Sequence, residues 1–243
     1  MLLPSELEAS RATEVSSIRR WEGGAIYMCR RAFLAWQRKR QQVDHENRNS
    51  AMSSNESQER LVAIARNNER FMSMLRAVRQ LKLESWCIGA GAVRNLVWDS
   101  IHGYKEPTHL ADVDVAYFDD KELAPASDEN LQSELSALMP GTPWEVTNQA
   151  AVHHWFEGHF GHPVSPLRSL EEAVASWPEY ATAVGLSLKW DDTMQVIAPY
   201  GLDDLFGCVV RRNPTRVSLE TYRSRIAQKN YPSRWPKVTV VHA

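Results

Sequence analysis

The amino-acid sequence lacks the features that mark membrane and secreted proteins. It contains no run of about eighteen apolar residues, the length that a membrane-spanning helix needs, and no signal peptide is recognisable. Its three cysteines, Cys29, Cys87 and Cys208, are odd in number and far apart, which is typical of reduced thiols rather than of a disulfide framework. These absences predict a cytoplasmic protein without a membrane partner.

The sequence also lacks an excess of charge of either sign. Lysine and arginine number 28, aspartate and glutamate 30, and the net charge is −2. This balance gives no indication of a long electrostatic footprint on nucleic acid, although a local basic groove is compatible with it. A hydrophobic fraction of 43% in 243 residues is enough for a sizeable core, so we expect one globular domain plus an extension.

Two common nucleotide-binding signatures are missing. No G-x-x-x-x-G-K-[ST] motif occurs, so a P-loop is not supported. The segment Gly89-Ala90-Gly91 does not continue into G-x-G-x-x-G, because Arg94 stands at the place of the third glycine. A dinucleotide site of that type is therefore not expected.

A glycine turn between a strand and a helix is present instead. Residues 85–88 read as a short buried strand, and Gly89 and Gly91 would let the backbone turn sharply and approach a ligand. The pattern predicts a helix from about Ala92, whose N-terminal amides would point at the turn and hold a phosphate. Its apolar residues recur at three- and four-residue steps: Val93, Leu96, Val97 and Ile101. A plain strand-to-helix turn is the alternative reading.

Paired acids follow on the next predicted strand. Asp112 and Asp114 alternate with Val113 and Val115, so their carboxylates project from one face, where they can share divalent metal ions. The alternative is a solvated edge, which is how we interpret Asp119-Asp120. A third acid, Glu145, lies between apolar neighbours in residues 144–147 and would join the pair from an adjacent strand, unless it is a plain exposed strand residue.

This order of elements resembles the DNA polymerase β-type nucleotidyltransferase superfamily. Residues 90–95 are similar to the Gly-Gly-x-Val-Arg-Asp turn of tRNA nucleotidyltransferases. Over residues 56–240, roughly, the sequence more closely resembles a family of uncharacterised bacterial nucleotidyltransferase-like proteins. The matching segments are 86–95, 97–99, 102–104, 112–115, 148–150, 177–178, 181–185, 197–206 and 235–237.

The resemblance implies an α/β (α+β) fold with a mixed sheet flanked by helices. It also implies Asp112, Asp114 and Glu145 as ligands of Mg²⁺ or Mn²⁺, with Gly89, Ala90 and Gly91 at the triphosphate, but it implies no particular acceptor. The chain departs from the pattern at three places: Ala90 replaces one of the paired glycines, Asn95 replaces an aspartate, and Ala151 stands where arginine is expected.

The N-terminal part differs from the rest in composition. Residues 1–55 are charged and polar, and this composition predicts a poorly ordered or partly helical extension with a short amphipathic helix at Ile26 to Trp36. We expect a nucleotidyltransferase-like domain to follow at residues 56–243. Because the resemblance begins just after Met52, translation starting near Met52 is an alternative to Met1.

Periodicity predicts further elements. These are a helix over 61–80, a helix from Asn130 to Leu138, a hairpin of 183–190 with 194–197, a short helix from Gly201, and a helix from Ser218 through Lys229. The histidines at 153, 154, 159 and 162 fit a zinc cluster or, preferably, a polar loop or capped helix, since no cysteine or H-E-x-x-H motif accompanies them. A contact of His153 or His154 with a substrate phosphate is a further alternative. Arg211, Arg212 and Arg216 fit either phosphate contacts or a solvated loop. Four tryptophans, Trp98, Trp144, Trp155 and Trp235, fit base stacking or, preferably, the core.

The function predicted is metal-dependent transfer of a nucleoside monophosphate from an NTP to an acceptor hydroxyl, with release of pyrophosphate. Asp112 and Asp114 would hold the metal ions, Glu145 would assist deprotonation, and Arg94 or Lys105 would neutralise developing charge. A structural ion pair is the alternative for Arg94. The alternative for the whole chain is a non-catalytic nucleotide-sensing module or a toxin-antitoxin-type interaction protein on the same fold.

Overall fold

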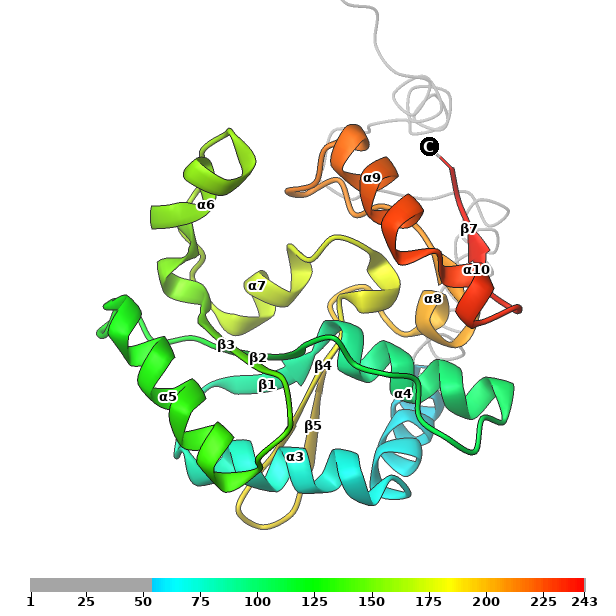
Figure 1. Cartoon of the computed structure of the whole chain (residues 1–243), viewed down its shortest axis with the longest axis horizontal. Coiled ribbons are helices and arrows are strands. Elements are labelled where there is room, and N and C mark those ends of the chain that lie inside the picture. Colours follow the sequence, from blue (N-terminus) through cyan, green and yellow to red (C-terminus); the bar gives the residue numbers. More distant parts are fainter. Residues whose placement is uncertain (1–53, 243) are drawn as a thin grey trace, which may run out of the picture. The chain divides into compact units, whose positions relative to one another are not determined.

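The computed structural model describes residues 54–242 (Figure 1). Residues 1–53 lie outside the described residues. They include nearly all of the predicted extension, its helix at Ile26 to Trp36, Cys29 and the alternative start at Met52. The division of the chain near residue 55 therefore stays a prediction. Within residues 54–242, no helix is long and apolar enough to cross a membrane.

A five-stranded mixed sheet organises the domain, in the order β3-β2-β1-β4-β5. Strands β2 and β3 are parallel, and the other three neighbouring pairs are antiparallel. This confirms the mixed sheet that the sequence predicted, including the β4–β5 hairpin. The strands are β1 (Trp86–Gly89), β2 (Val113–Tyr117), β3 (Trp144–Asn148), β4 (Gly185–Leu188) and β5 (Met194–Ile197).

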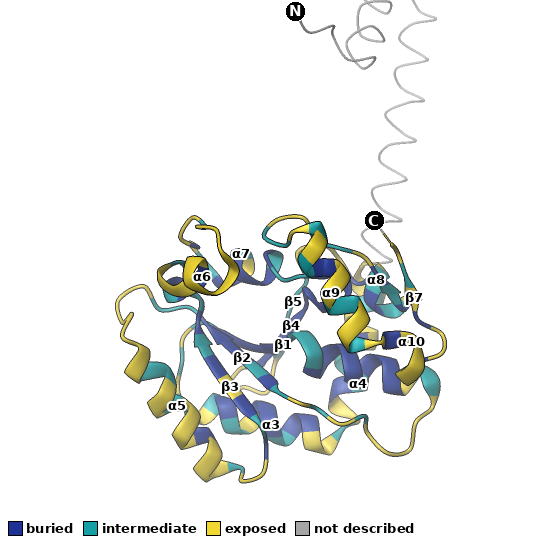
Figure 2. Ribbon diagram, turned by 45° about the horizontal axis from the view of Figure 1, so that its top comes forward, coloured by how far each residue is buried: buried dark blue, intermediate teal, exposed yellow. Residues whose placement is uncertain are grey.

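The two faces of the sheet have different partners. On one face, Ile88, Val115 and Val146 belong to the main core, together with side chains from α3 (Glu69–Gln80) and α4 (Ala90–His102). On the other face, the small side chains of Cys87 and Ala116 contact α7 (Leu170–Ala175). Because side chains alternate along a strand, Asp114 and Glu145 lie on this second, less filled face. Figure 2 shows burial concentrated in the strands, α3 and α4.

Three predicted helix boundaries are wrong. The single helix over 61–80 is divided: residues 54–66 are helical, and α3 starts anew after Asn68, whose side chain accepts a hydrogen bond from Phe71 N at 2.9 Å. Helix α5 (Pro125–Leu138) begins five residues before Asn130, because Pro125 suits the first position of a helix. Helix α4 begins at Ala90, so the glycine turn and the first helical turn overlap.

The C-terminal half consists mainly of short elements. Ser218 caps α9 (Leu219–Lys229), which confirms the predicted start of that helix, and Ser169 caps α7. The sequence did not predict α10 (Tyr231–Arg234), which follows Asn230 in the left-handed conformation. The other elements are η2 (Gln149–Ala151), α6 (Val152–Phe160), η3 (Tyr180–Thr182), α8 (Asp203–Phe206), β6 (Val209–Val210) and β7 (Thr239–Val240), with β6 and β7 forming a parallel pair.

A cluster of aromatic rings joins α4 to the C-terminal segment. Trp98 packs edge-on against Tyr231 and Trp235, with ring centroids 5.8 and 5.2 Å away. Trp98 Nε1 donates to Leu205 O at 2.8 Å, and Trp235 Nε1 donates to Asp99 Oδ1 at 2.7 Å. Trp98 and Trp235 are both fully buried, which confirms the preferred reading of these two tryptophans as core residues.

Candidate active site

A cavity of about 310 Å³ lies on the less filled face of the sheet. Asp112, Asp114 and Glu145 line one side of it, and Gly91 and Arg94 of α4 line another. Trp177 and Pro178, which follow α7, also border it. The structure thus brings together most of the predicted site residues.

The three carboxylates come from neighbouring strands. Asp112 immediately precedes β2, Asp114 lies within it, and Glu145 on β3 is the register partner of Asp114. In a parallel pair, residues in register project from the same face, so Asp114 and Glu145 are neighbours. Strand β2 starts at Val113, one residue later than the sequence predicted, and Asp112 still lines the cavity beside Asp114.

Like charges surround Asp114. Burial raises the pKa of this carboxyl, and the charges of Asp112 and Glu145 raise it further, to about 6. The positive charges of Lys229 and Arg94 lower the pKa of Asp114, but they do not cancel this rise. The site therefore concentrates negative charge that a bound cation would stabilise.

The donors suit a hard divalent cation, because all three are carboxylate oxygens, the ligands that Mg²⁺ and Mn²⁺ prefer. Within residues 54–242, no three side chains of the histidine, cysteine or acidic type are already gathered closely enough to hold an ion. In Mg²⁺ sites, one or two carboxylates commonly share the ion with waters and substrate phosphates. The same finding gives no support to zinc at the histidines of α6.

The residues of the glycine turn have different surroundings. A Cβ on Gly89 would overlap the Trp177 ring and come within 2.9 Å of Val184 O, so this glycine makes room for packing. A Cβ on Gly91 would lie 3.7 Å from Asp112 Oδ1, at an ordinary contact distance. Ala90, in the place of a family glycine, has a φ of 47°, which costs an alanine about 1–2 kcal/mol. Only Ala90 and Gly91 of the turn line the cavity.

Alanine at each glycine should separate packing from ligand contact. We expect Gly89→Ala to lower the free energy of unfolding by about 1–3 kcal/mol, because the Trp177 ring must move. Gly91→Ala should keep or raise stability, by up to about 1 kcal/mol, since alanine suits a helix better. Gly91→Ala should nevertheless weaken Mg-NTP binding, because its methyl group would face the cavity. Urea unfolding and NTP titration measure the two effects; NTP binding unchanged in Gly91→Ala would contradict the placement of phosphates here.

Arg94 is buried in an aromatic setting beside the cavity. Its guanidinium lies 5.0 Å from the Tyr231 ring and 5.5 Å from the rings of Trp98 and Trp235. Its Nη2 donates to Asn95 Oδ1 at 2.7 Å. In the part of the chain that the structure describes, Arg94 forms no ion pair, so its alternative reading as an ion-pair partner gains no support.

Other predicted contacts lie elsewhere. Lys105 is exposed and borders a different cavity, between the Asn67-Asn68 turn and the loop after α4, so the structure does not bring it to the carboxylates. Arg211 pairs with Asp204 at 2.8 Å, and Arg216 donates to Ser165 O at 2.6 Å. Neither of these two arginines lines the carboxylate cavity.

Several residues of the cavity were not predicted as site residues, and four of them have large or charged side chains that bear on its chemistry. These four are Trp177, Arg225, Lys229 and Arg234. The four-residue spacing of Arg225 and Lys229 in a predicted helix indicates a shared face, and that signal was available in the sequence. Nothing in the sequence around Trp177 indicates that its ring covers Gly89.

The mixed sheet, the three carboxylates and the helix that begins at the glycine turn define a protein of the nucleotidyltransferase type. Residues 76–240 match the family described as nucleotidyltransferase, and the chain belongs to this family. The reaction class of the family is transfer of a nucleotidyl group, which confirms the enzyme class that the sequence predicted.

A solved structure agrees with this fold. An NMR structure described as a CCA-adding enzyme head domain shares 28% identity, with a TM-score of 0.66, over 76% of this chain and 96% of that one. A tRNA-processing enzyme in an apo form shares 17% identity, with a TM-score of 0.44, over 72% of this chain and 44% of that one. The CCA-adding enzyme of Bacillus stearothermophilus in complex with CTP shares 18% identity, with a TM-score of 0.33, over 65% of this chain and 35% of that one. No curated protein matches the sequence.

Proposed function

We propose that the protein transfers a nucleoside monophosphate from an NTP to an acceptor hydroxyl and releases pyrophosphate, using Mg²⁺ or Mn²⁺, in the cytoplasm. One observation carries the proposal: Asp112, Asp114 and Glu145 converge from neighbouring strands on a cavity that the first turn of α4 also borders. Membership of the nucleotidyltransferase family supports the reaction class. The catalytic unit proposed is residues 56–243.

Each side of the cavity has a separate task. Asp112 and Asp114 would hold the divalent metal, which supplies positive charge at the transferred phosphate and lowers the pKa of the attacking hydroxyl. Glu145, which is exposed beside Asp114, would orient that hydroxyl and accept its proton. The first-turn amides of α4 near Gly91 would donate to phosphate oxygens.

The buried Arg94 provides charge near the same place. Its position between aromatic rings fixes the guanidinium and excludes water from its inner side. A cation held in this way needs no reorganisation when negative charge develops on the departing phosphates. We therefore assign Arg94, rather than Lys105, to the stabilisation of the leaving group.

Label transfer tests the proposal even while the acceptor is unidentified. Purified full-length protein is incubated with each α-labelled NTP, with Mg²⁺ or Mn²⁺, and with a cell extract freed of nucleotides. We expect label to enter an acceptor and pyrophosphate to appear in equal amount, and both to stop when EDTA is added. If no NTP gives transfer, and NTP binding does not depend on metal, the non-catalytic interaction module replaces this proposal.

A further inference from the structure

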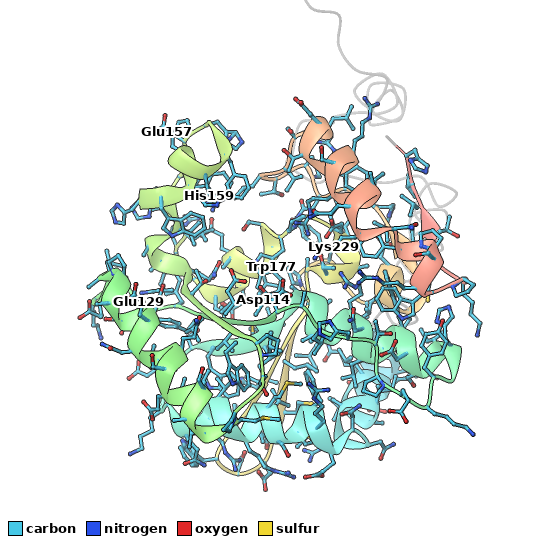
Figure 3. The ribbon with its side chains drawn as sticks, viewed as in Figure 1. Asp114, Glu129, Glu157, His159, Trp177 and Lys229 are labelled. Carbon is cyan, nitrogen blue, oxygen red and sulfur yellow. The ribbon has the colours of Figure 1, made fainter. Side chains whose placement is uncertain are left out.

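Three cations that the proposed mechanism leaves unused border the cavity. Arg225 and Lys229 lie four residues apart in α9, and therefore on the same side of that helix, and Arg234 follows in α10. All three line the cavity that also contains Asp112, Asp114 and Glu145. Figure 3 shows Lys229 and Trp177 close to Asp114 in the middle of the molecule. We call Arg225, Lys229 and Arg234 the basic wall.

The basic wall stands on a firmly packed helix. Tyr222 of α9 is fully buried, and its hydroxyl lies 3.0 Å from Val210 O and 2.8 Å from Val241 O. Asn230, with a φ of 44°, ends the helix and donates its backbone N–H to Ile226 O at 3.1 Å. The chain then continues directly into α10. Lys229, at the end of α9, and Arg234, at the end of α10, therefore lie on two short helices whose relative direction is set by the turn at Asn230.

Arg225 is oriented by a buried acid. Glu179 has no exposed surface, and its Oε1 accepts a hydrogen bond from Arg225 Nε at 3.0 Å. The other oxygen of Glu179 accepts from Thr182 Oγ1 at 2.9 Å. Arg225 uses only its Nε for this contact. The N–H groups of its two terminal guanidinium nitrogens therefore remain available to a second anion on the cavity side.

The basic wall and the carboxylates do not neutralise each other directly. In residues 54–242, no ion pair joins Arg225, Lys229 or Arg234 to the three acids of the cavity. The cavity therefore presents acids for a cation on one side and bases for an anion on another. A polyphosphate chelated to a divalent metal ion has this same division of charge.

The glycine turn leaves part of a triphosphate without partners. Gly89 is covered by Trp177, and the first turn of α4 contains no basic side chain before Arg94. Its free amides can hold only the phosphate that faces them. The remaining phosphates of an NTP need donors from elsewhere in the cavity.

We propose that Lys229 and Arg234, together with Arg225 as held by Glu179, bind the β- and γ-phosphates of the incoming NTP and the pyrophosphate that leaves. This inference rests on the proposed nucleotidyl transfer and assigns its leaving-group subsite to the basic wall. Lysine and arginine donate charge-assisted hydrogen bonds to phosphate, and the pyrophosphate would depart along the side of the cavity that α9 and α10 form.

Binding of inorganic tripolyphosphate and pyrophosphate tests the subsite directly. Both anions are titrated into the full-length protein with Mg²⁺, by calorimetry and by tryptophan fluorescence, for wild type, Lys229→Gln and Arg234→Gln. Lys121→Gln is the matched control, because Lys121 is exposed on the loop before α5 and does not line the cavity. Substitution of Arg225 is avoided, since it would leave Glu179 buried and unpaired.

We expect each of Lys229→Gln and Arg234→Gln to bind both anions about tenfold or more weakly than wild type, with circular dichroism and Tm unchanged. Lys121→Gln should bind like wild type. Wild-type affinity in both wall variants overturns the inference. If that result accompanies label transfer by wild type, the transferase proposal stands and only the subsite is wrong. If the wall variants lose anion binding while wild type transfers no label, the subsite stands and the transferase proposal fails.

Discussion

Asp112→Asn and Asp114→Asn are each expected to reduce nucleotidyl transfer by about a thousandfold or more. Each change removes one of the two carboxylates that would hold the metal, and metal charge at the transferred phosphate is worth several kcal/mol. Label transfer from α-labelled NTP, followed over hours for the variants and minutes for wild type, measures the loss. Asp120→Asn, at an exposed position just after β2, is the matched control and should transfer like wild type. Full activity in Asp114→Asn would refute the assignment.

The substitution Asp114→Asn should also stabilise the metal-free protein against unfolding. The pKa of Asp114 is raised to about 6, above its ordinary value of 3.8, by burial and then by Asp112 and Glu145. An acid with a raised pKa destabilises the folded state; this penalty is complete above about pH 6 and declines as pH falls from about 6 towards the ordinary value of 3.8. Without metal at pH 8, the free energy of unfolding of Asp114→Asn should therefore exceed that of wild type by about 1–3 kcal/mol. The variant should accordingly unfold at a higher temperature.

Thermal unfolding in EDTA at pH 8 and pH 5 checks this expectation. The gap between wild type and Asp114→Asn should narrow at pH 5, where the wild-type carboxyl is protonated. Mg²⁺ should raise the Tm of wild type more than that of the variant. A variant that is less stable than wild type at pH 8 in EDTA would show that Asp114 makes stabilising contacts that outweigh the repulsion.

Trp98→Ala is expected to cost about 3–5 kcal/mol of folding free energy, a large part of the total for a domain. The indole is fully buried, packs against Tyr231 and Trp235, and donates to Leu205 O, which would be left without this donor. Urea unfolding measures the loss. Trp190→Ala, at a residue that is 62% exposed, is the control and should change stability much less. A loss below about 1 kcal/mol for Trp98→Ala would mean that α10 does not depend on this cluster.

The sequence predicted those parts of the fold and candidate site that depend on local alternation. Asp112 and Asp114 alternate with valines, and Glu145 lies between apolar residues, so strand geometry alone places them on a shared face. The sequence placed Glu145 on an adjacent strand, but the parallel register of β2 with β3 that makes Asp114 and Glu145 neighbours was not predicted. Capping by Ser169 and Ser218 was also predictable, because it depends on residues within one helical turn.

The rest depends on contacts between residues far apart in the sequence. Trp177 covers Gly89 across nearly ninety residues, and no local pattern indicates such a contact. Lys229 reaches the cavity because Tyr222 and the turn at Asn230 orient α9, whereas the sequence shows only a basic helix. Lys105, which is nearer to the acids in the sequence, lies at another cavity because Asp99 Oδ2 accepts a hydrogen bond from Thr108 N at 2.7 Å and fixes the intervening loop.

The placement of acids and bases on separate elements has a consequence for synthesis on the ribosome. Arg225 and Lys229 are translated about eighty residues after Glu145, a delay of roughly 4–16 s at ordinary elongation rates. During that interval the nascent chain already contains β1, β2 and β3, with their three acids, but none of the α9 cations. Divalent ions in the surrounding solution can screen this acidic group until translation supplies the second half of the cavity.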